Sequence, residues 1–209
     1  MEIQVWADFH CPYCYIGKAR FMKALEQLGL DGQVAVVPRS FLLNPKKDRP
    51  EGLPLAEHVK MDYDRKLEDI LKNFQGLDAQ GRELGLPMSM DQAHYASMMD
   101  AHRLMQYART KDLGNEFFRV AQEALFARGA ILSDRTTLLA IARETGLEEA
   151  EAAAVLDSSQ YQEEVLADDA AARRMNIDYV PYYLTAGGYH FSGDLNMAAY
   201  QQHLEQAFK

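Results

Sequence analysis

The sequence is poor in cysteine, with only Cys11 and Cys14 among its 209 residues. It also lacks any stretch approaching the roughly 20 apolar residues that a helix needs to cross a bilayer, so we expect no membrane span. The first residues, MEIQVWADFHC, have neither a basic start nor a long apolar run, so no signal peptide is visible. These absences predict a cytoplasmic protein.

Positive charge is also scarce. The chain carries 22 Lys and Arg against 31 Asp and Glu, which gives a net charge of −9, and it has no basic run. Nucleic-acid binding needs clustered cations to neutralise phosphates, so this class of partner is not expected. With 48% hydrophobic and 25% charged residues, the composition is that of an ordinary globular chain with a substantial core. The length allows one domain, or one domain with a large insertion.

The chain has no second cysteine pair, which bears on what the two thiols do. A structural zinc site takes four ligands, and the six histidines show no tight pair on one helical face, so no metal is expected. In a reducing cytoplasm a stable structural disulfide is rare. A C-x-x-C segment near a β-α-β pattern favours a redox-active motif, with zinc binding and an inert buried pair as the alternatives.

Both cysteines lie in one short segment, DFHCPYCYIGK, at residues 8–18. The preceding EIQVWA (2–7) is short, β-prone and alternating, which predicts a first strand. Pro12 suits the first position of a helix, where its missing N–H costs nothing. An apolar stripe at helical spacing continues this helix as far as Gly29, and QVAVVPRSFLL (33–43) predicts a second strand.

The strand–cysteine–helix order gives the two cysteines different roles. Cys11 is placed at the helix N-terminus, where unpaired backbone N–H groups and the helix dipole stabilise a thiolate. Cys14 follows one turn later on the same face, so it reaches back to Cys11 but is more covered. We therefore expect Cys11 to attack and Cys14 to resolve.

The middle of the chain, from about 54 to 176, has almost no alternating stretch and is rich in helix-forming residues. This texture predicts a block of helices. The segment 76–87 is expected to be a short helix or a loop. Four longer helices are expected at 91–109, 114–129, 134–146 and 148–157.

Several residues mark where these helices begin and end. Ser133 and Asp134 are candidate N-caps, and Gly146 is a candidate stop. The spacing of SQYQ (159–162) resembles a capping box before a helix that runs to about Met175.

Strand character returns only near the end of the chain. DYVPYYLTAGGYHFSG (178–193) predicts a strand, a Gly-Gly turn and a second strand, and NMAAYQQHLEQAF (196–208) predicts a closing helix. The predicted order is therefore β-α-β, a helical block, then α-β-β-α.

Four segments in this order resemble a known family. They are D-x-x-C-P-Y-C-Y-I-G-K (8–18), R-S-F-L-L-N-P (39–45), D-A-H-R-L (100–104) and Y-V-P-Y-Y-L (179–184). Together they are similar to the DsbA-type thioredoxin-fold oxidoreductases, most closely the cytoplasmic FrnE-like members, which usually have Trp where Tyr13 stands. The resemblance implies an α/β, thioredoxin-like fold with a large all-helical insertion. It further implies a thioredoxin-like domain at 1–48 and 163–209, and an inserted helical domain at 49–162.

The resemblance also implies a site. Cys11, Cys14 and Pro181 would be catalytic, with a cis Val180–Pro181 bond in a loop that faces the cysteines. The backbone of Val180 would then be free to pair with an extended peptide or a glutathione-like ligand. The further candidates for substrate binding are Pro12, Tyr13, His10 and His102.

Three of these assignments have alternatives. A buried structural histidine is an alternative account of His102, and a protonated His10 would add positive charge beside Cys11. Asp8 could help to move protons for Cys14, or it could be a strand-end carboxylate in solvent.

The activity expected from this resemblance is thiol–disulfide exchange through Cys-Pro-Tyr-Cys. The alternative is a glutathione-dependent isomerase or transferase of the hydroxychromene-carboxylate isomerase or kappa-class type, whose members usually have Ser at the first active-site position. A third class is a non-catalytic module that senses redox state. The expected partners are a disulfide-containing protein or a small thiol or disulfide. No cofactor is expected beyond the thiols, with glutathione as a candidate substrate or recycling thiol, and the protein is expected to be a monomer or a homodimer.

Overall fold

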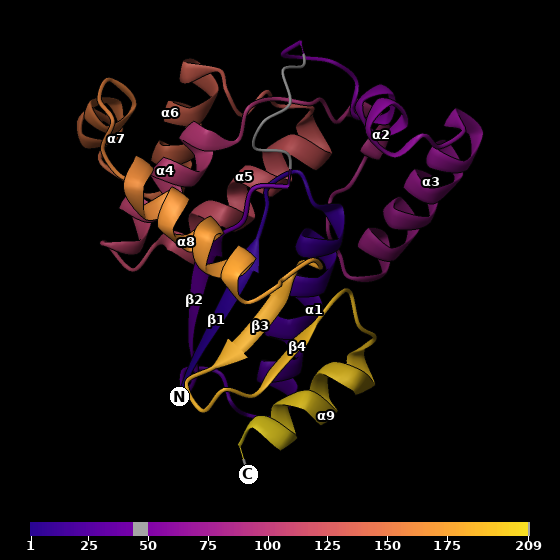
Figure 1. Ribbon diagram of the computed structural model, residues 1–209, viewed down its shortest axis with the longest axis vertical. Helices are drawn as coiled ribbons and strands as arrows, with labels where there is room; N and C mark the ends of the chain where they lie inside the picture. The colour runs from indigo at the N-terminus through magenta and orange to yellow at the C-terminus, as the bar shows by residue number, and fades with distance from the viewer. Residues whose placement is uncertain (44–49, 209) are drawn as a thin grey trace.

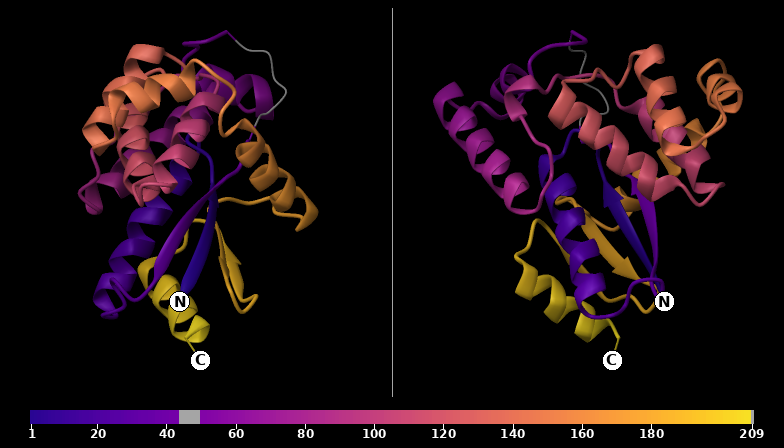
Figure 2. Two further views of the ribbon diagram at one scale, coloured as in Figure 1. Left: turned by 90° about the vertical axis from the view of Figure 1, so that its left-hand side faces the viewer. Right: turned by 180° about the vertical axis from the view of Figure 1, so that it is seen from behind.

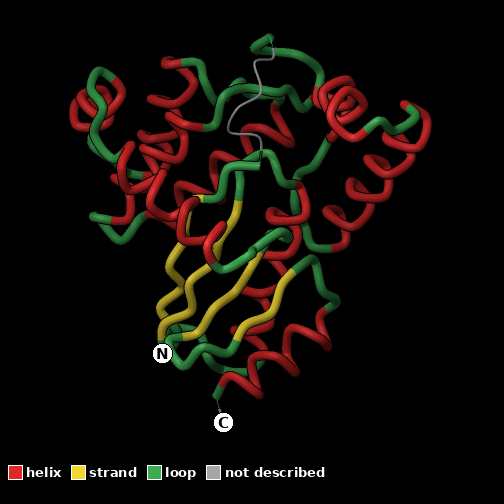
Figure 3. The backbone as a smooth tube through the Cα atoms, viewed as in Figure 1, coloured by secondary structure: helices red, strands yellow, loops and turns green. Residues whose placement is uncertain are grey.

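A computed structural model describes residues 1–43 and 50–208 of the chain. Its strands are β1 (Glu2–Ala7), β2 (Ala35–Ser40), β3 (Tyr182–Thr185) and β4 (His190–Ser192). They form one mixed sheet in the order β2-β1-β3-β4, shown in yellow in Figure 3. β1 runs parallel to β2 and antiparallel to β3, and β4 is antiparallel to β3. The predicted strands are therefore present, although β2 is shorter than the predicted 33–43.

One face of the sheet is covered by α1 (Pro12–Gln27) and α9 (Met197–Ala207), as the right-hand view of Figure 2 shows. Ile3 and Val5 alternate along β1 and point into this layer, which follows from the period of two along a strand. They join a core whose other large members are Phe21, Leu25, Tyr183, Phe191, Tyr200 and Leu204.

The helical block lies beyond the end of the sheet at which β1 and β2 finish (Figure 1). Its helices are α2 (Leu55–Tyr63), α3 (Leu67–Glu83), α4 (Met99–Arg109), α5 (Gly114–Arg128), α6 (Arg135–Thr145), α7 (Glu149–Leu156) and α8 (Gln162–Arg174). A second core cluster joins Cys11 and Cys14 to the buried phenylalanines of α5. The cysteine segment therefore lies where the sheet meets the helical block.

The expected helix at 91–109 is shorter than predicted. α4 begins only at Met99, after a 3-10 turn at Met90–Gln92 and an extended segment in which His94 bridges to Pro54. Groups from elsewhere in the fold take the N–H groups that a helix would use, because Ala96 N donates to His10 Nε2 and Ser97 N donates to Glu51. Long-range hydrogen bonds thus override the helical propensity of 91–98.

Two of the predicted helix ends are confirmed and one is wrong. Asp134 caps α6 by accepting a hydrogen bond from Thr137 N, and Gly146 ends it with φ of 90°. The SQYQ segment forms no capping box, because α8 starts after Tyr161, whose φ is 63° and whose side chain makes no cap. The guanidinium of Arg103 instead holds this turn by donating to the Gln160 carbonyl at 2.8 Å.

The expected division into two domains stays a prediction. Its boundary at 48/49 lies outside the described residues, as do Asn44 and Pro45 of the quoted RSFLLNP segment. The boundary at 162/163 falls at the start of α8, which packs against both β2 and α4. α8 is therefore in contact with both parts of the fold.

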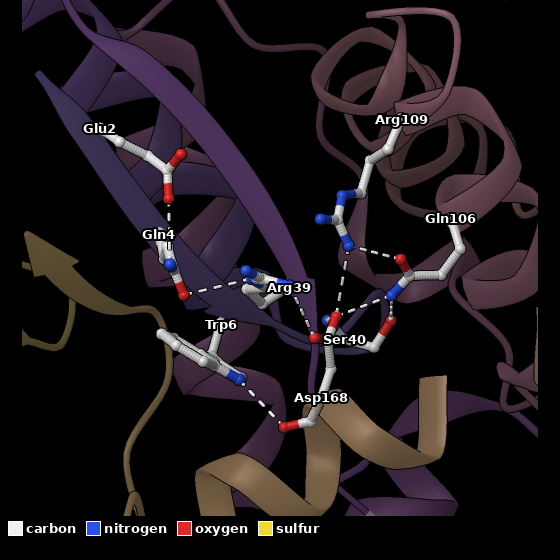
Figure 4. Close-up of polar contacts among 8 residues, drawn as sticks. All are labelled: Glu2, Gln4, Trp6, Arg39, Ser40, Gln106, Arg109 and Asp168. Atoms are coloured by element: carbon white, nitrogen blue, oxygen red, sulfur yellow. Dashed lines mark hydrogen bonds and ion pairs between the residues drawn. The ribbon is translucent and has the colours of Figure 1, made fainter. Parts of the chain in front are cut away.

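Asp168 on α8 is the polar centre of that contact (Figure 4). Its buried carboxylate accepts hydrogen bonds from Ser40 N at 3.1 Å and from the Gln106 side-chain amide at 2.7 Å. Two arginines pair with the same carboxylate, Arg39 at 3.1 Å and Arg109 at 3.6 Å. One side chain therefore ties α8 to the edge strand β2 and to α4.

We expect Asp168→Ala to lower the free energy of unfolding by about 3 kcal/mol, because it leaves two partly buried arginines without their shared counter-ion. Urea unfolding measures this loss. The matched control is Asp157→Ala, which removes an exposed ion pair with Arg135 and should cost less than about 1 kcal/mol. Equal losses in the two variants would contradict the central role of Asp168.

Candidate active site

The two cysteines lie at the start of α1 as free thiols. Cys11 is the N-cap residue, with an extended backbone (φ −85°, ψ 104°), and Pro12 opens the helix. The backbone N–H of Cys14 donates to Cys11 Sγ over 3.2 Å. This N–H lies in the first turn of α1 and is shared with the Cys11 carbonyl oxygen at 3.0 Å. Its position at the helix N-terminus favours negative charge on the Cys11 sulfur.

A loop from the other end of the chain faces Cys11. The Val180–Pro181 peptide bond is cis, and the Cys11 thiol lies 3.7 Å from the carbonyl oxygen of Val180. The carbonyl of Pro181 in turn accepts from Gly193 N at 2.8 Å, which anchors this loop to the end of β4. The fold therefore brings together Cys11, Cys14, Val180 and Pro181, four of the residues chosen from the sequence.

Pro12 and Tyr13 lie at the edge of this site. Tyr13 is 39% exposed, and its hydroxyl donates to Asn73 Oδ1 of α3 at 3.2 Å. Tyr179, directly before Val180, is 70% exposed. Both exposed tyrosines are thus close in sequence to residues that meet at the site, Tyr13 to Cys14 and Tyr179 to Val180.

His10 is a neutral residue that packs beneath the site. Its ring stacks on Tyr95 with centroids 5.1 Å apart, and its Nε2 accepts a hydrogen bond from Ala96 N at 3.2 Å. Burial, reinforced by the neighbouring His58 and His102, lowers the pKa of His10 to about 3. His10 therefore supplies no positive charge to Cys11, which corrects the idea that a protonated imidazole lies beside the thiol.

His102, a candidate for substrate binding, lies in the protein interior. His102 is 0% exposed and packs edge-on against Phe9, with ring centroids 4.8 Å apart. Neither ring nitrogen has a hydrogen-bond partner in the described parts of the chain, and burial lowers its pKa to about 3. The structural alternative, a neutral buried histidine, fits these observations.

Asp8 is buried, so it is not a solvent-exposed carboxylate at a strand end. Its two oxygens accept from His10 N at 2.7 Å and from Leu43 N at 2.8 Å, which holds the loop between β1 and α1 in place. Burial raises the pKa of this carboxyl to about 6. Asp8 can therefore exchange a proton close to neutral pH.

Gln122 on α5 is a site residue that the sequence analysis missed. It is fully buried, and its Nε2 lies 3.2–3.4 Å from the carbonyl oxygens of Asp8, Phe9 and Cys11. The available signal was its position on the apolar face of a predicted helix, four residues after Phe118. A polar residue on such a face needs a buried partner, and here the partner is the cysteine loop.

The two thiols differ in their surroundings. Burial, together with the hydrogen bond and charge interaction with Cys11, raises the pKa of Cys14 well above its ordinary value. Cys14 therefore stays protonated while Cys11 receives the helix-terminal N–H. In the described segments, no group of three or more His, Cys, Asp or Glu residues could hold a metal ion, and no helix is long and apolar enough to cross a membrane.

Comparisons with known proteins agree with the thioredoxin-like fold. A model of the DSBA-like thioredoxin domain matches residues 2–205, so the chain belongs to this family. A crystal structure of a probable DsbA oxidoreductase from Streptomyces coelicolor superposes with a TM-score of 0.93. It is 31% identical, and the match covers 100% of this chain and 90% of that one.

Two more distant structures share the fold. One is a 2-hydroxychromene-2-carboxylate isomerase, 16% identical with a TM-score of 0.68, matched over 100% of this chain and 94% of that one. The other is the cytosolic disulfide reductase DsbM from Pseudomonas aeruginosa, solved with GSH. It is 16% identical with a TM-score of 0.66, matched over 100% of this chain and 99% of that one. The predicted thioredoxin-like fold with a helical insertion is therefore confirmed.

Gly17 on α1 packs closely against the side chains of Tyr200 and Pro181. A Cβ at this position would lie 2.8 Å from Tyr200 Oη and 3.0 Å from Pro181 Cγ. We expect Gly17→Ala to push Pro181 away from α1, to lower the free energy of unfolding by about 1–3 kcal/mol and to slow reaction of the thiols with a disulfide. Urea unfolding and stopped-flow thiol kinetics measure these effects.

Gly76 on α3 provides the matched control, because a Cβ there would have no atom within 4 Å. Gly76→Ala should raise the free energy of unfolding by about 0.5–1 kcal/mol through its higher helix propensity, and it should leave the thiol kinetics unchanged. If Gly17→Ala behaves like Gly76→Ala, the contact with Pro181 does not constrain the site.

The Asp8 carboxyl makes stability depend on pH. Its pKa rises from 3.8 to about 6 on folding, so between these values the folded state binds a proton more tightly than the unfolded state. The contribution of Asp8 to stability is therefore lost as the pH rises from 4 to 6. We expect the unfolding free energy of Asp8→Asn minus that of the wild type to grow by about 1.4 kcal/mol per pH unit over this range, about 3 kcal/mol in all.

Urea titrations of both proteins at several pH values test this, since all other carboxyl groups cancel in the difference. The side-chain amide of the Asp8→Asn variant accepts one of the two backbone hydrogen bonds less well than the carboxylate does, and this adds the same amount to the stability difference at every pH. A difference that stays flat from pH 4 to 7 would show that the Asp8 carboxyl has an ordinary pKa in the fold.

Proposed function

We propose that the protein is a thiol–disulfide oxidoreductase that exchanges disulfides through Cys11-Pro12-Tyr13-Cys14. The observation that carries the proposal is the position of Cys11 Sγ, between the N–H of Cys14 at 3.2 Å and the carbonyl of Val180 at 3.7 Å. The first contact favours the thiolate, and the second sets it beside a loop that can receive an extended substrate. Family membership supports the same chemistry.

The reaction proceeds in two exchanges. The Cys11 thiolate attacks one sulfur of a substrate disulfide, forms a mixed disulfide and releases the other substrate sulfur as a thiolate, which takes up a proton. Cys14 then loses its proton and attacks Cys11 Sγ, which releases the second substrate sulfur and leaves a Cys11–Cys14 disulfide. The substrate gains two electrons and two protons, and the enzyme loses them. The reverse sequence oxidises a dithiol, and the direction depends on the reduction potential of the surrounding thiol pool.

The substrate would be a disulfide-containing protein or a small disulfide. The Val180 backbone beside Cys11 supports recognition of an extended chain. Tyr13 and Tyr179 are exposed neighbours in sequence of Cys14 and Val180, so they are candidates for apolar contact with the substrate. Glutathione is the proposed small thiol for recycling, because a neighbour of the same fold, a cytosolic disulfide reductase, was solved with GSH. We further propose that the protein works in the cytoplasm as a monomer or homodimer, without another cofactor.

A glutathione-dependent isomerase or transferase is the second candidate, since a 2-hydroxychromene-2-carboxylate isomerase shares the fold. The second cysteine argues against it. Cys14 is buried directly behind Cys11 and bonded to it through its backbone N–H, an arrangement that isomerisation does not need and disulfide exchange does. A non-catalytic redox-sensing module would keep the pair but would not turn over substrate.

We expect Cys11→Ser to abolish the reduction of insulin disulfides by glutathione or dithiothreitol, because no thiolate remains at the helix N-terminus. Cys14→Ser should keep the attack but lose the resolution, so mixed disulfides through Cys11 should accumulate. Mass spectrometry of the trapped species identifies the attached cysteine.

Other outcomes would contradict the thiol roles or the proposed activity. Turnover without Cys11, or equal trapping by the two single variants, would remove the assignment of attacking and resolving thiols. Efficient conjugation of glutathione to chlorodinitrobenzene, or isomerisation of a chromene carboxylate, without insulin reduction would favour the second candidate.

A further inference from the structure

Lys18 is a buried cation for which the exchange mechanism above has no role. It lies on α1 one turn after Cys14 and is only 8% exposed. Its Nζ stands 4.7 Å from the ring centroid of Phe118 and has no hydrogen-bond partner within residues 1–43 and 50–208. Burial of an unpaired ammonium is costly, so a lysine in this position calls for an explanation.

Lys18 follows Cys14 by four residues on α1. Residues four apart lie on one helix face, and helical side chains lean toward the N-terminus, which here is the cysteine end. Burial lowers the pKa of Lys18 to about 7, while the Cys14 thiolate acts in the opposite direction and raises it. Near neutral pH the protonated and neutral forms of the Lys18 amine are therefore present in comparable amounts. A negative charge on Cys14 shifts this equilibrium toward the protonated form.

A cavity of about 320 Å³ connects Lys18 to the surface between α1 and α5. Four buried polar atoms without a hydrogen-bond partner in the described residues belong to side chains that line it: Tyr15 Oη, Lys18 Nζ, Asn115 Oδ1 and Gln122 Oε1. Two can donate and two accept, and the volume has room for several waters. The rim carries the exposed Asp112, Glu116 and Arg119, so protons can reach solvent by this route.

Few other groups around Cys14 can carry a positive charge that would compensate the negative charge of its thiolate. Asp8 and Cys11 both raise the pKa of Cys14 by their charge. From β3 and α9, Tyr183 and Tyr200 face it with pKa values raised by burial, so they remain neutral.

The remaining titratable groups nearby are also accounted for. His10 and His102 are neutral at physiological pH because burial lowers the pKa of each to about 3. From α5, Glu116 and Arg119 face Lys18 and bind each other at 2.7 Å. Among these groups, Lys18 is the buried one that can become a cation when Cys14 becomes an anion.

We propose that Lys18 is the proton acceptor of the resolving step: its neutral amine takes the proton that Cys14 loses, and the ammonium that results stabilises the Cys14 thiolate. This inference rests on the proposed disulfide exchange and names the residue that accepts the proton in its second step. The Cys14 S–H bond breaks and an N–H bond forms on Lys18. The thiolate then attacks Cys11 Sγ, and the Cys11–substrate S–S bond breaks. Lys18 afterwards returns its proton to solvent through the cavity.

The two half-reactions can be separated with the chromogenic disulfide of thionitrobenzoate. Reduced protein releases one coloured thiolate when Cys11 attacks and a second when Cys14 resolves the mixed disulfide. In Lys18→Met, which keeps the apolar stem, we expect the first phase to be unchanged and the second to be at least about tenfold slower at pH 7, in line with the usual contribution of a positioned base. Lys23→Met, an exposed position on the same helix, serves as the control and should match the wild type in both phases.

The pH profile separates proton acceptance from a structural role. In the wild type the second phase should accelerate as the pH rises through about 7, where the amine becomes neutral. In Lys18→Met this rise should move to higher pH, toward the raised pKa of Cys14 itself. A slower second phase with an unshifted profile, or an unchanged second phase, would overturn the proposal.

Lys18→Arg keeps a permanent cation that cannot accept a proton. Its second phase should stay slow without a rise near pH 7, and a profile like that of the wild type would mean that charge alone matters, against the proposal. If neither variant folds, the wild-type profile decides, since a second phase that does not change between pH 6 and 8 excludes Lys18 as the acceptor. Absence of the first phase in the wild type would instead refute disulfide exchange itself.

Discussion

The hydrogen bonds of Gln122 to the loop between β1 and α1 are the contacts on which the site depends. Three backbone carbonyls of this loop, those of Asp8, Phe9 and Cys11, converge on one side-chain amide of α5. Two of these carbonyls also accept from backbone N–H groups of the same segment, since Cys11 N donates to Asp8 O and Cys14 N donates to Cys11 O. The Gln122 amide adds a donor from α5 that reaches all three carbonyls, including that of Phe9. The helical block therefore does more than cover the sheet, because it holds the cysteine loop in the position that presents Cys11 to Val180.

Burial sets the chemistry of the ionisable groups around the thiols. It raises the pKa of Asp8 and Cys14 and lowers that of His10 and Lys18, so each group is pushed toward its neutral form. Cys11 differs because a helix-terminal N–H is directed at its sulfur. In such a site an additional charge is stable only if another group changes its protonation at the same moment, which couples thiol chemistry to proton transfer.

Local signals in the sequence predicted the elements that depend on local hydrogen bonds. The start of α1 after Cys11, the Asp134 cap and the Gly146 stop agree with the structure because each rests on contacts within one turn. The helix expected from residue 91 was wrong over its first eight positions, since side chains far away in the sequence accept hydrogen bonds from Ala96 N and Ser97 N. The placement of His10 and His102 was open for the same reason, because their burial depends on packing between distant segments.

The sequence by itself determined where the reactive pair lies, which cysteine receives the helix terminus and which strands surround it, since these follow from spacing over a few residues. The family resemblance led us to expect the Val180–Pro181 loop opposite the cysteines, whereas residue spacing alone did not connect Val180 with Cys11, 169 positions away. Only the tertiary structure decided that Gln122 and Lys18 line one cavity. It also decided the protonation of the buried groups. The physical reason is that desolvation and long-range hydrogen bonds depend on which distant segments come into contact, and residue spacing along the chain does not specify those contacts.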